Sequence, residues 1–255
     1  MSAKLNYLIL GISLAVGVVL RTFMLLFTVE TNSGFIKQAY ITPALLIIVF
    51  IVIAAALVFV TSLNHKKRIL KQETIPLAKA ITGLLLAVAI FYEAFLSNLL
   101  EYATPTQSLF HRVSAILSVA AFIYIAVCYF TKKEYPKIIA AVPILFWITR
   151  VITVFTEFAT LATVSDTVIE TATMCLCLFV FLNSAKVECK IEIKRMNLAR
   201  AVAALCGYVG LVSSLPRIIC AVITPEAFGY FSNIPPFTSL AAALFAINFA
   251  LQIEE

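Results

Sequence analysis

The sequence predicts an all-α, polytopic membrane protein with eight transmembrane helices, arranged as four helical hairpins of the same sense with both termini cytoplasmic. The first observation is composition: 62% of the residues are hydrophobic and 13% are charged, whereas a soluble domain is roughly 45–50% apolar and about 25% charged. The second is a series of eight apolar segments, and the third is an uneven distribution of basic residues between alternate loops. Together they predict a single transmembrane domain over residues 1–255.

The eight segments are each close to the length of ~20 residues that an α-helix needs to cross a bilayer. The predicted spans cover residues 5–27, 42–60, 76–100, 105–130, 138–158, 166–182, 201–223 and 236–251. Even-numbered spans begin at helix-capping residues, such as Thr42-Pro43 and Ser165-Asp166. The first segment is longer than the apolar region of a signal peptide, and no small-residue cleavage site follows it, so we expect it to remain as a span.

Basic residues give the expected orientation. They gather in the loops on the side of the N-terminus, and the opposite loops hold only Lys37. By the positive-inside rule, this places the N-terminus in the cytoplasm and the chain in the cell membrane. The net charge of +6 therefore indicates membrane orientation and contact with anionic lipid headgroups, and nucleic acid is not an expected partner.

A short pattern recurs along the chain and predicts an internal repeat. Each odd-numbered span carries an ionisable residue toward its outer end, and a loop that usually opens with an acid follows. The span residues are Arg21, Glu93, Arg150 and Arg217, and the loop acids are Glu30, Glu101, Glu157 and Glu226. Because all four hairpins run in the same sense, we expect them to pack around an axis along the membrane normal.

The four ionisable span residues are the predicted substrate-binding site. An arginine at mid-membrane costs ~2.5–3.5 kcal/mol on the insertion scale, so its presence favours a functional role. The planar guanidinium suits carboxylate or phosphate. We therefore expect Arg21, Arg150 and Arg217 to bind a small polar or anionic solute at an outward-facing site, for transport, with Glu93 as counter-charge or proton carrier. The alternative is a structural clasp, in which each arginine pairs with the loop acid of its own hairpin.

A second predicted polar cluster lies on the even-numbered spans and comprises His111, Arg112, Asp166 and Glu170. Asp166 and Glu170 are four residues apart and share a helix face. With His111 they suggest a proton relay or a partial metal site, which leaves an intramembrane enzyme as an alternative function. The sequence has no catalytic, metal-binding or phosphate-binding motif, so an enzyme is the less favoured class, and no cofactor is expected.

The longest polar stretch, residues 183–200, alternates in charge sign. It is either an amphipathic helix or a solvated cytoplasmic connector, and we expect the connector. Its residues 186–200 form a potential docking surface for a protein partner, so a non-enzymatic membrane subunit or sensor is a further alternative. Membrane lipid is the partner that the composition itself implies.

Overall fold

The structure, a computed structural model, describes residues 3–29, 36–63, 77–97, 105–130, 139–158, 165–189, 191, 193, 195–223 and 236–252. Within these ranges the protein is helical, as the composition predicts. The eight α-helices are α1 (Ala3–Phe23), α2 (Ile41–Leu63), α3 (Leu77–Ser97), α4 (Pro105–Phe130), α5 (Val142–Phe158), α6 (Ser165–Glu188), α7 (Met196–Ile223) and α8 (Pro236–Gln252).

Four stretches are long and apolar enough to cross a membrane, namely Leu8–Thr28, Gln38–Leu63, Val168–Glu188 and Met196–Ile223. They fit the predicted class of an integral membrane protein. The apolar parts of α3, α4, α5 and α8 are shorter, at 10–17 residues each. The count of eight spans therefore stays a prediction.

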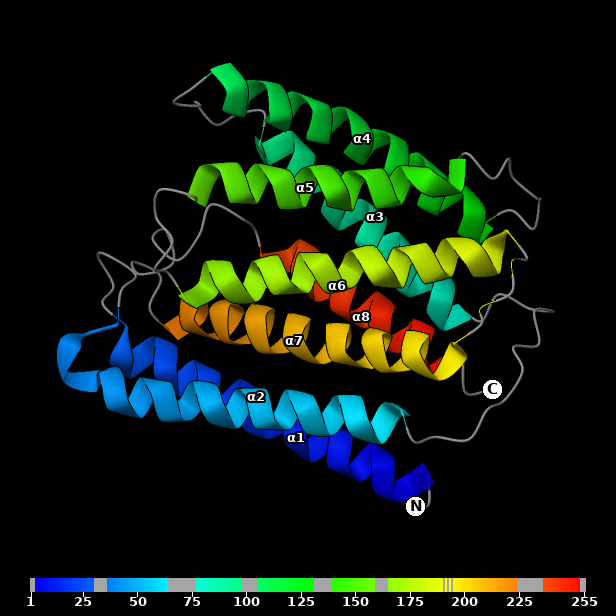
Figure 1. Ribbon diagram of the computed structural model, residues 1–255. Helices are drawn as coiled ribbons and strands as arrows, with labels where there is room; N and C mark the ends of the chain where they lie inside the picture. Colours follow the sequence, from blue (N-terminus) through cyan, green and yellow to red (C-terminus); the bar gives the residue numbers. More distant parts are fainter. Residues whose placement is uncertain are drawn as a thin grey trace.

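Helices α3 to α8 form a closed ring of six. Each of these helices packs against the next in the chain, and α8 packs back against α3. Two polar contacts join the last pair: Asn248 Nδ2 donates to Thr82 Oγ1 at 3.1 Å, and Thr238 Oγ1 donates to the Ala89 carbonyl at 3.3 Å. Helices α1 and α2 pack on each other and on the outer side of α7, below the ring in the view of Figure 1.

The tightest packing in the ring is between α7 and α8, where small residues let the two backbones approach. A Cβ atom at Gly210 would lie 2.8 Å from the Cβ of Ala243, and one at Gly207 would overlap Ile247. Small residues are the usual device for close helix contacts in membranes, since lipid gives no hydrophobic drive for association. This packing fixes α7 at the centre of the molecule.

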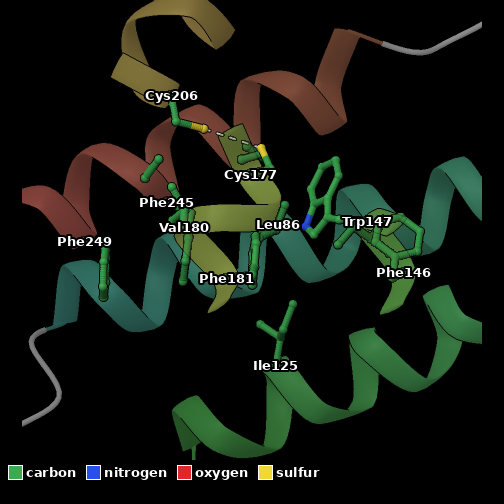
Figure 2. Packing of buried hydrophobic residues seen from close by; sticks show 14 of the residues in the cluster. Leu86, Ile125, Phe146, Trp147, Cys177, Val180, Phe181, Cys206, Phe245 and Phe249 are labelled. Atoms are coloured by element: carbon green, nitrogen blue, oxygen red, sulfur yellow. Dashed lines mark hydrogen bonds between the residues drawn. The ribbon is translucent and has the colours of Figure 1, made fainter. Parts of the chain in front are cut away.

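The interior of the ring is apolar and rich in aromatic rings. Phe181 of α6 stacks on Phe245 of α8 with ring centroids 5.0 Å apart, and Trp147 of α5 lies 6.0 Å from Phe181. Figure 2 shows these rings together, with Cys177 and Cys206 facing each other at 3.5 Å beside them. The aromatic rings therefore join α5, α6 and α8, and the contact between the two cysteines adds α7 to this core.

The segment 183–200 differs from the expected solvated connector. Helix α6 continues to Glu188, and α7 begins at Met196, so helices take up most of the segment. The turn between them is closed by backbone hydrogen bonds, including one from Ile191 to the Lys186 carbonyl at 2.8 Å. The alternation of charge did not indicate a buried helix face, yet two of the charged side chains, Glu188 and Arg200, contact other helices.

Candidate functional site

The ion pair between Arg150 and Glu93 is the first polar feature of the ring interior. Arg150 Nη2 contacts Glu93 Oε1, which ties the middle of α5 to the last part of α3. Both residues are buried, with exposed fractions of 6% and 5%. The predicted site residues Arg150 and Glu93 therefore lie together, although they belong to different predicted hairpins.

A small polar cavity adjoins this ion pair. It has a volume of about 10 Å³, and its wall includes Ser114 and Ser118 of α4 and the apolar residues Ile90, Ala115 and Phe146. That volume is close to the ~10–15 Å³ that one water molecule requires. Glu93 Oε2 has no hydrogen-bond partner among the described residues. The cavity thus offers a position from which a water molecule, or a polar group of a ligand, reaches the carboxylate.

A second ion pair joins two other helices of the ring. Arg217 Nη1 of α7 lies 3.4 Å from Glu170 Oε1 of α6, and both side chains are almost fully buried. Pro216 precedes the arginine inside α7, where it removes the hydrogen bond that a backbone N–H would make one turn back. Glu170 was predicted to act with His111 and Asp166, but its described partner is Arg217.

Arg21 occupies a different setting from the other two arginines. It is 1% exposed, and its Nη1 donates to Sδ of Met24 at 3.2 Å, within the same stretch of chain. A π-helical segment, Met24–Thr28, begins just after it. Such wide turns frequently occur at functional sites. The described hydrogen bond of Arg21 is local, whereas the ion pairs of Arg150 and Arg217 cross between helices.

A half-buried carboxylate that the sequence analysis did not select, Glu188, lies at the other end of the ring. Tyr124 of α4 donates its hydroxyl to Glu188 Oε2 of α6, and Ser184 Oγ donates to Glu188 Oε1 at 3.3 Å. A cavity of about 10 Å³ adjoins them, with Pro143 in its wall. The sequence analysis assigned Glu188 to the solvated connector. A helical pattern of apolar residues that continues to residue 188 is the signal that would have placed it in α6.

An aromatic layer separates the two small cavities. Phe146 lines the cavity at Glu93, Phe181 lines the cavity at Glu188, and Trp147 contacts both rings. The indole of Trp147 is 2% exposed, and its Nε1 has no hydrogen-bond partner within the described ranges. In Figure 2 the indole nitrogen points into the ring interior beside Leu86. Trp147 is therefore a polar group held inside the apolar layer between two polar cavities.

The remaining predicted residues divide into two groups. Arg112 is exposed on α4. The side chains of His111, Asp166 and Glu157, and the loop acids Glu30, Glu101 and Glu226, lie outside the described residues. The structure therefore does not test the His111–Asp166 relay or the clasps with loop acids. Among the side chains that it describes, no three His, Cys, Asp or Glu residues gather as metal ligands do.

Arg200 is the largest departure from the expected connector. Its side chain is 1% exposed, and its Nε and Nη2 donate to the Ser62 carbonyl at 3.0 and 2.6 Å. This carbonyl is in the last turn of α2, where carbonyl groups lack intrahelical partners. Arg200 therefore caps α2 from α7, and it is a buried structural residue of the proposed docking segment 186–200.

Comparisons with models of protein families, with curated proteins and with solved structures found no match.

Proposed function

We propose that this protein binds and transports a small polar or anionic solute through the interior of the six-helix ring, with Arg150 and Glu93 as the binding pair. The observation that carries the proposal is the buried ion pair beside a water-sized polar cavity. An ionisable pair inside a membrane protein is costly to maintain and is concentrated at ion and substrate pathways. Arg217 and Glu170 then hold α6 against α7 and shape the ring.

The chemistry of binding follows from the pair itself. A carboxylate or phosphate of the solute takes the place of Glu93 on the planar guanidinium of Arg150, which offers two parallel N–H donors. Glu93, displaced from its counter-charge, accepts a proton or contacts a cationic group of the solute. Either event keeps the buried site electrically balanced, since an unpaired charge in a low-dielectric interior is strongly unfavourable.

The cavity beside Glu188 is the second end of the proposed solute path. Glu188, with Tyr124 and Ser184, supplies an acceptor on the far side of the aromatic layer. Passage from one cavity to the other requires movement of Phe146, Trp147 or Phe181. We assign Trp147 the role of gate residue because its indole N–H, which has no hydrogen-bond partner among the described residues, can donate to a solute or water that enters the layer.

The proposal includes the finer topology. Eight spans, four hairpins of one sense, an internal repeat and cytoplasmic termini in the cell membrane would place the Glu93–Arg150 cavity toward the outer surface and Glu188 toward the cytoplasm. The distribution of basic residues supports this orientation. Accessibility of single introduced cysteines in the loops to a membrane-impermeant maleimide would test it independently of transport.

The experiment uses the purified full chain reconstituted in liposomes. Acetate, succinate, glutamate, glycine betaine and inorganic phosphate are first screened by thermal shift, and radiolabelled uptake is then measured for those that raise the melting temperature. We expect Arg150→Met to lower uptake by about tenfold or more, equivalent to ~1.4 kcal/mol of binding free energy. Stabilisation by none of these probes would contradict the proposal.

The matched control separates binding from folding. Removing one member of a buried ion pair is destabilising, but replacing both by hydrophobic residues of similar volume is often neutral. The double variant Glu93→Met with Arg150→Met is therefore expected to regain folded abundance without regaining uptake. The double variant Glu170→Met with Arg217→Met serves as reference and is expected to regain both. Uptake at the normal rate in the Glu93/Arg150 double variant would show that the pair is only structural.

A further inference from the structure

One carboxylate oxygen of Glu93 has unused bonding capacity beside the small cavity. The side chain is 5% exposed, and its Oε1 contacts Nη2 of Arg150. Its Oε2 has no hydrogen-bond partner among the described residues. Glu93 lines the cavity of about 10 Å³ together with Ser114 and Ser118. A buried carboxylate oxygen without a donor is rare in native structures, so this atom requires either a water molecule or a proton.

Arg150 is the one charged side chain that contacts Glu93 in the described part of the chain. Helix α3, which carries Glu93, packs against α4 and α8. Helix α8 contains no ionisable residue, and the α4 residues in the cavity wall are two serines and an alanine. Arg112 of α4 and Tyr92, the residue before Glu93, are both exposed, and Tyr124 of α4 donates to a different carboxylate. The carboxylate and the guanidinium therefore form an electrically neutral pair.

Binding of an anion at Arg150 changes this balance, and the inference rests on that proposed function. The solute carboxylate takes the donor that Glu93 holds. An arginine has five N–H donors, so other contacts of the guanidinium can stay in place during the exchange. Glu93 then becomes a buried carboxylate without a counter-charge, which is strongly unfavourable. The site returns to neutrality only if one positive charge reaches Glu93 together with the anion.

The size of the cavity selects a proton as that charge. The volume of about 10 Å³ is close to the requirement of one water molecule. The cationic group of a zwitterionic solute brings its carbon substituents with it and needs more space than this. A proton adds no volume, and a buried carboxyl group that lacks a counter-charge is commonly neutralised in this way.

Ser118 supports both protonation states of Glu93. Its hydroxyl donates to the Ala115 carbonyl at 2.6 Å, so its oxygen lone pairs can accept a hydrogen bond. A water molecule in the cavity would donate to Oε2 of the ionised carboxylate. When Glu93 is protonated, the same water would accept from the acid O–H and donate to the Ser118 hydroxyl oxygen. Neither state leaves the carboxyl group without a partner.

We propose that one proton binds to Glu93 with each monovalent anion at Arg150, so that the site carries monocarboxylates by electroneutral proton co-transport. Hydronium in the aqueous phase gives its proton to Glu93 Oε2 and becomes water, and the reverse transfer accompanies release of the anion. Arg150, the bound anion and protonated Glu93 together carry no net charge. A dicarboxylate would leave one negative charge uncompensated in the ring interior, so the site discriminates against it.

The test counts the protons that the purified full chain takes up with its ligand in detergent. Isothermal titration calorimetry with acetate is run at neutral pH in two buffers that differ in ionisation enthalpy, and the difference in heat gives the number of protons. We expect one proton per acetate. The Kd for acetate is expected to rise about tenfold for each unit of pH above neutral, as linkage to one proton requires. Succinate is expected to bind about tenfold more weakly than acetate or worse.

Glu93→Gln replaces the acid by a neutral group of the same shape and is the discriminating variant. It is expected to bind acetate without proton uptake and without dependence on pH. The double variant Glu170→Met with Arg217→Met, in the other ion pair of the ring, is the control and should keep one proton per acetate. If Glu93→Gln does not fold, the wild-type proton count and its pH dependence decide the question on their own. Acetate binding to the wild type without a proton would overturn this inference and leave the proposed function standing, whereas no binding of any probe anion would overturn both.

Discussion

The six-helix ring and the α1–α2 pair contain similar apolar helices but use them differently. The α1–α2 pair packs against α7 of the ring. In α7, 61% of the most apolar 18-residue stretch is buried, whereas the corresponding value for the stretch that contains α2 is 22%. Both described inter-helix ion pairs, Glu93–Arg150 and Glu170–Arg217, lie in the ring. The α1–α2 pair instead contacts the ring mainly through aliphatic side chains and Tyr208.

Two of the three arginines in the recurring sequence pattern form ion pairs between helices of the ring. Arg21, Arg150 and Arg217 each stand near the end of an apolar segment, and all three are buried. The ring arginines contact carboxylates on neighbouring helices, while the described hydrogen bond of Arg21 is to Met24 of its own segment. The two ring arginines therefore join neighbouring helices and contribute to the tertiary structure of the ring.

The largest expected effect comes from breaking the ion pair in the ring that we regard as structural. Arg217→Met leaves Glu170 buried beside an apolar side chain, and loss of one partner of a buried pair costs about 3–5 kcal/mol. We expect a steep loss of folded protein, measured by fluorescence-detected size-exclusion chromatography after heating. The double variant Glu170→Met with Arg217→Met should recover most of that loss. If Arg217→Met alone were as stable as the wild type, the pair would not hold α6 to α7.

The sequence predicts features that depend on local composition and periodicity, and it does not predict which helices become neighbours. Apolar length and composition predicted the all-helical fold, and the cost of a charge in a span singled out Glu93, Arg150 and Arg217, which the structure buries. Their role in binding a solute stays a prediction. Pairing was not predictable, because which helices are neighbours depends on tertiary packing. Glu188 and Arg200 were assigned to solvent because they lie beside exposed charges in the sequence. Their partners, Tyr124 and the Ser62 carbonyl, are distant in the chain.

An intermediate effect is expected where the α1–α2 pair meets the ring. Gly17→Ala would place a methyl group 2.5 Å from the Tyr208 hydroxyl and 2.9 Å from Val212 Cγ2. Overpacking of this kind costs about 1–3 kcal/mol. Gly11→Ala is the matched control on the same helix, since its new methyl group meets nothing within 4 Å. Equilibrium unfolding in mixed detergent micelles would compare the two. Equal stability of the variants would mean that α1 adjusts freely on α7.

The smallest effect concerns the closure of the ring between α8 and α3. Asn248→Ala removes the hydrogen bond from Nδ2 to Thr82 Oγ1, and such bonds between membrane helices contribute ~0.6 kcal/mol on average. A loss of this size is expected in the same unfolding experiment. A thiol cross-link between cysteines introduced at the two positions should form in both the wild-type background and Gly17→Ala, because ring closure does not depend on α1.

A loss well above ~1.7 kcal/mol, the largest value known for such bonds, would instead show that Asn248 maintains the ring through more than this contact. The ring would then depend on a polar seam between α8 and α3 rather than on the close approach of α7 and α8 at Gly207 and Gly210.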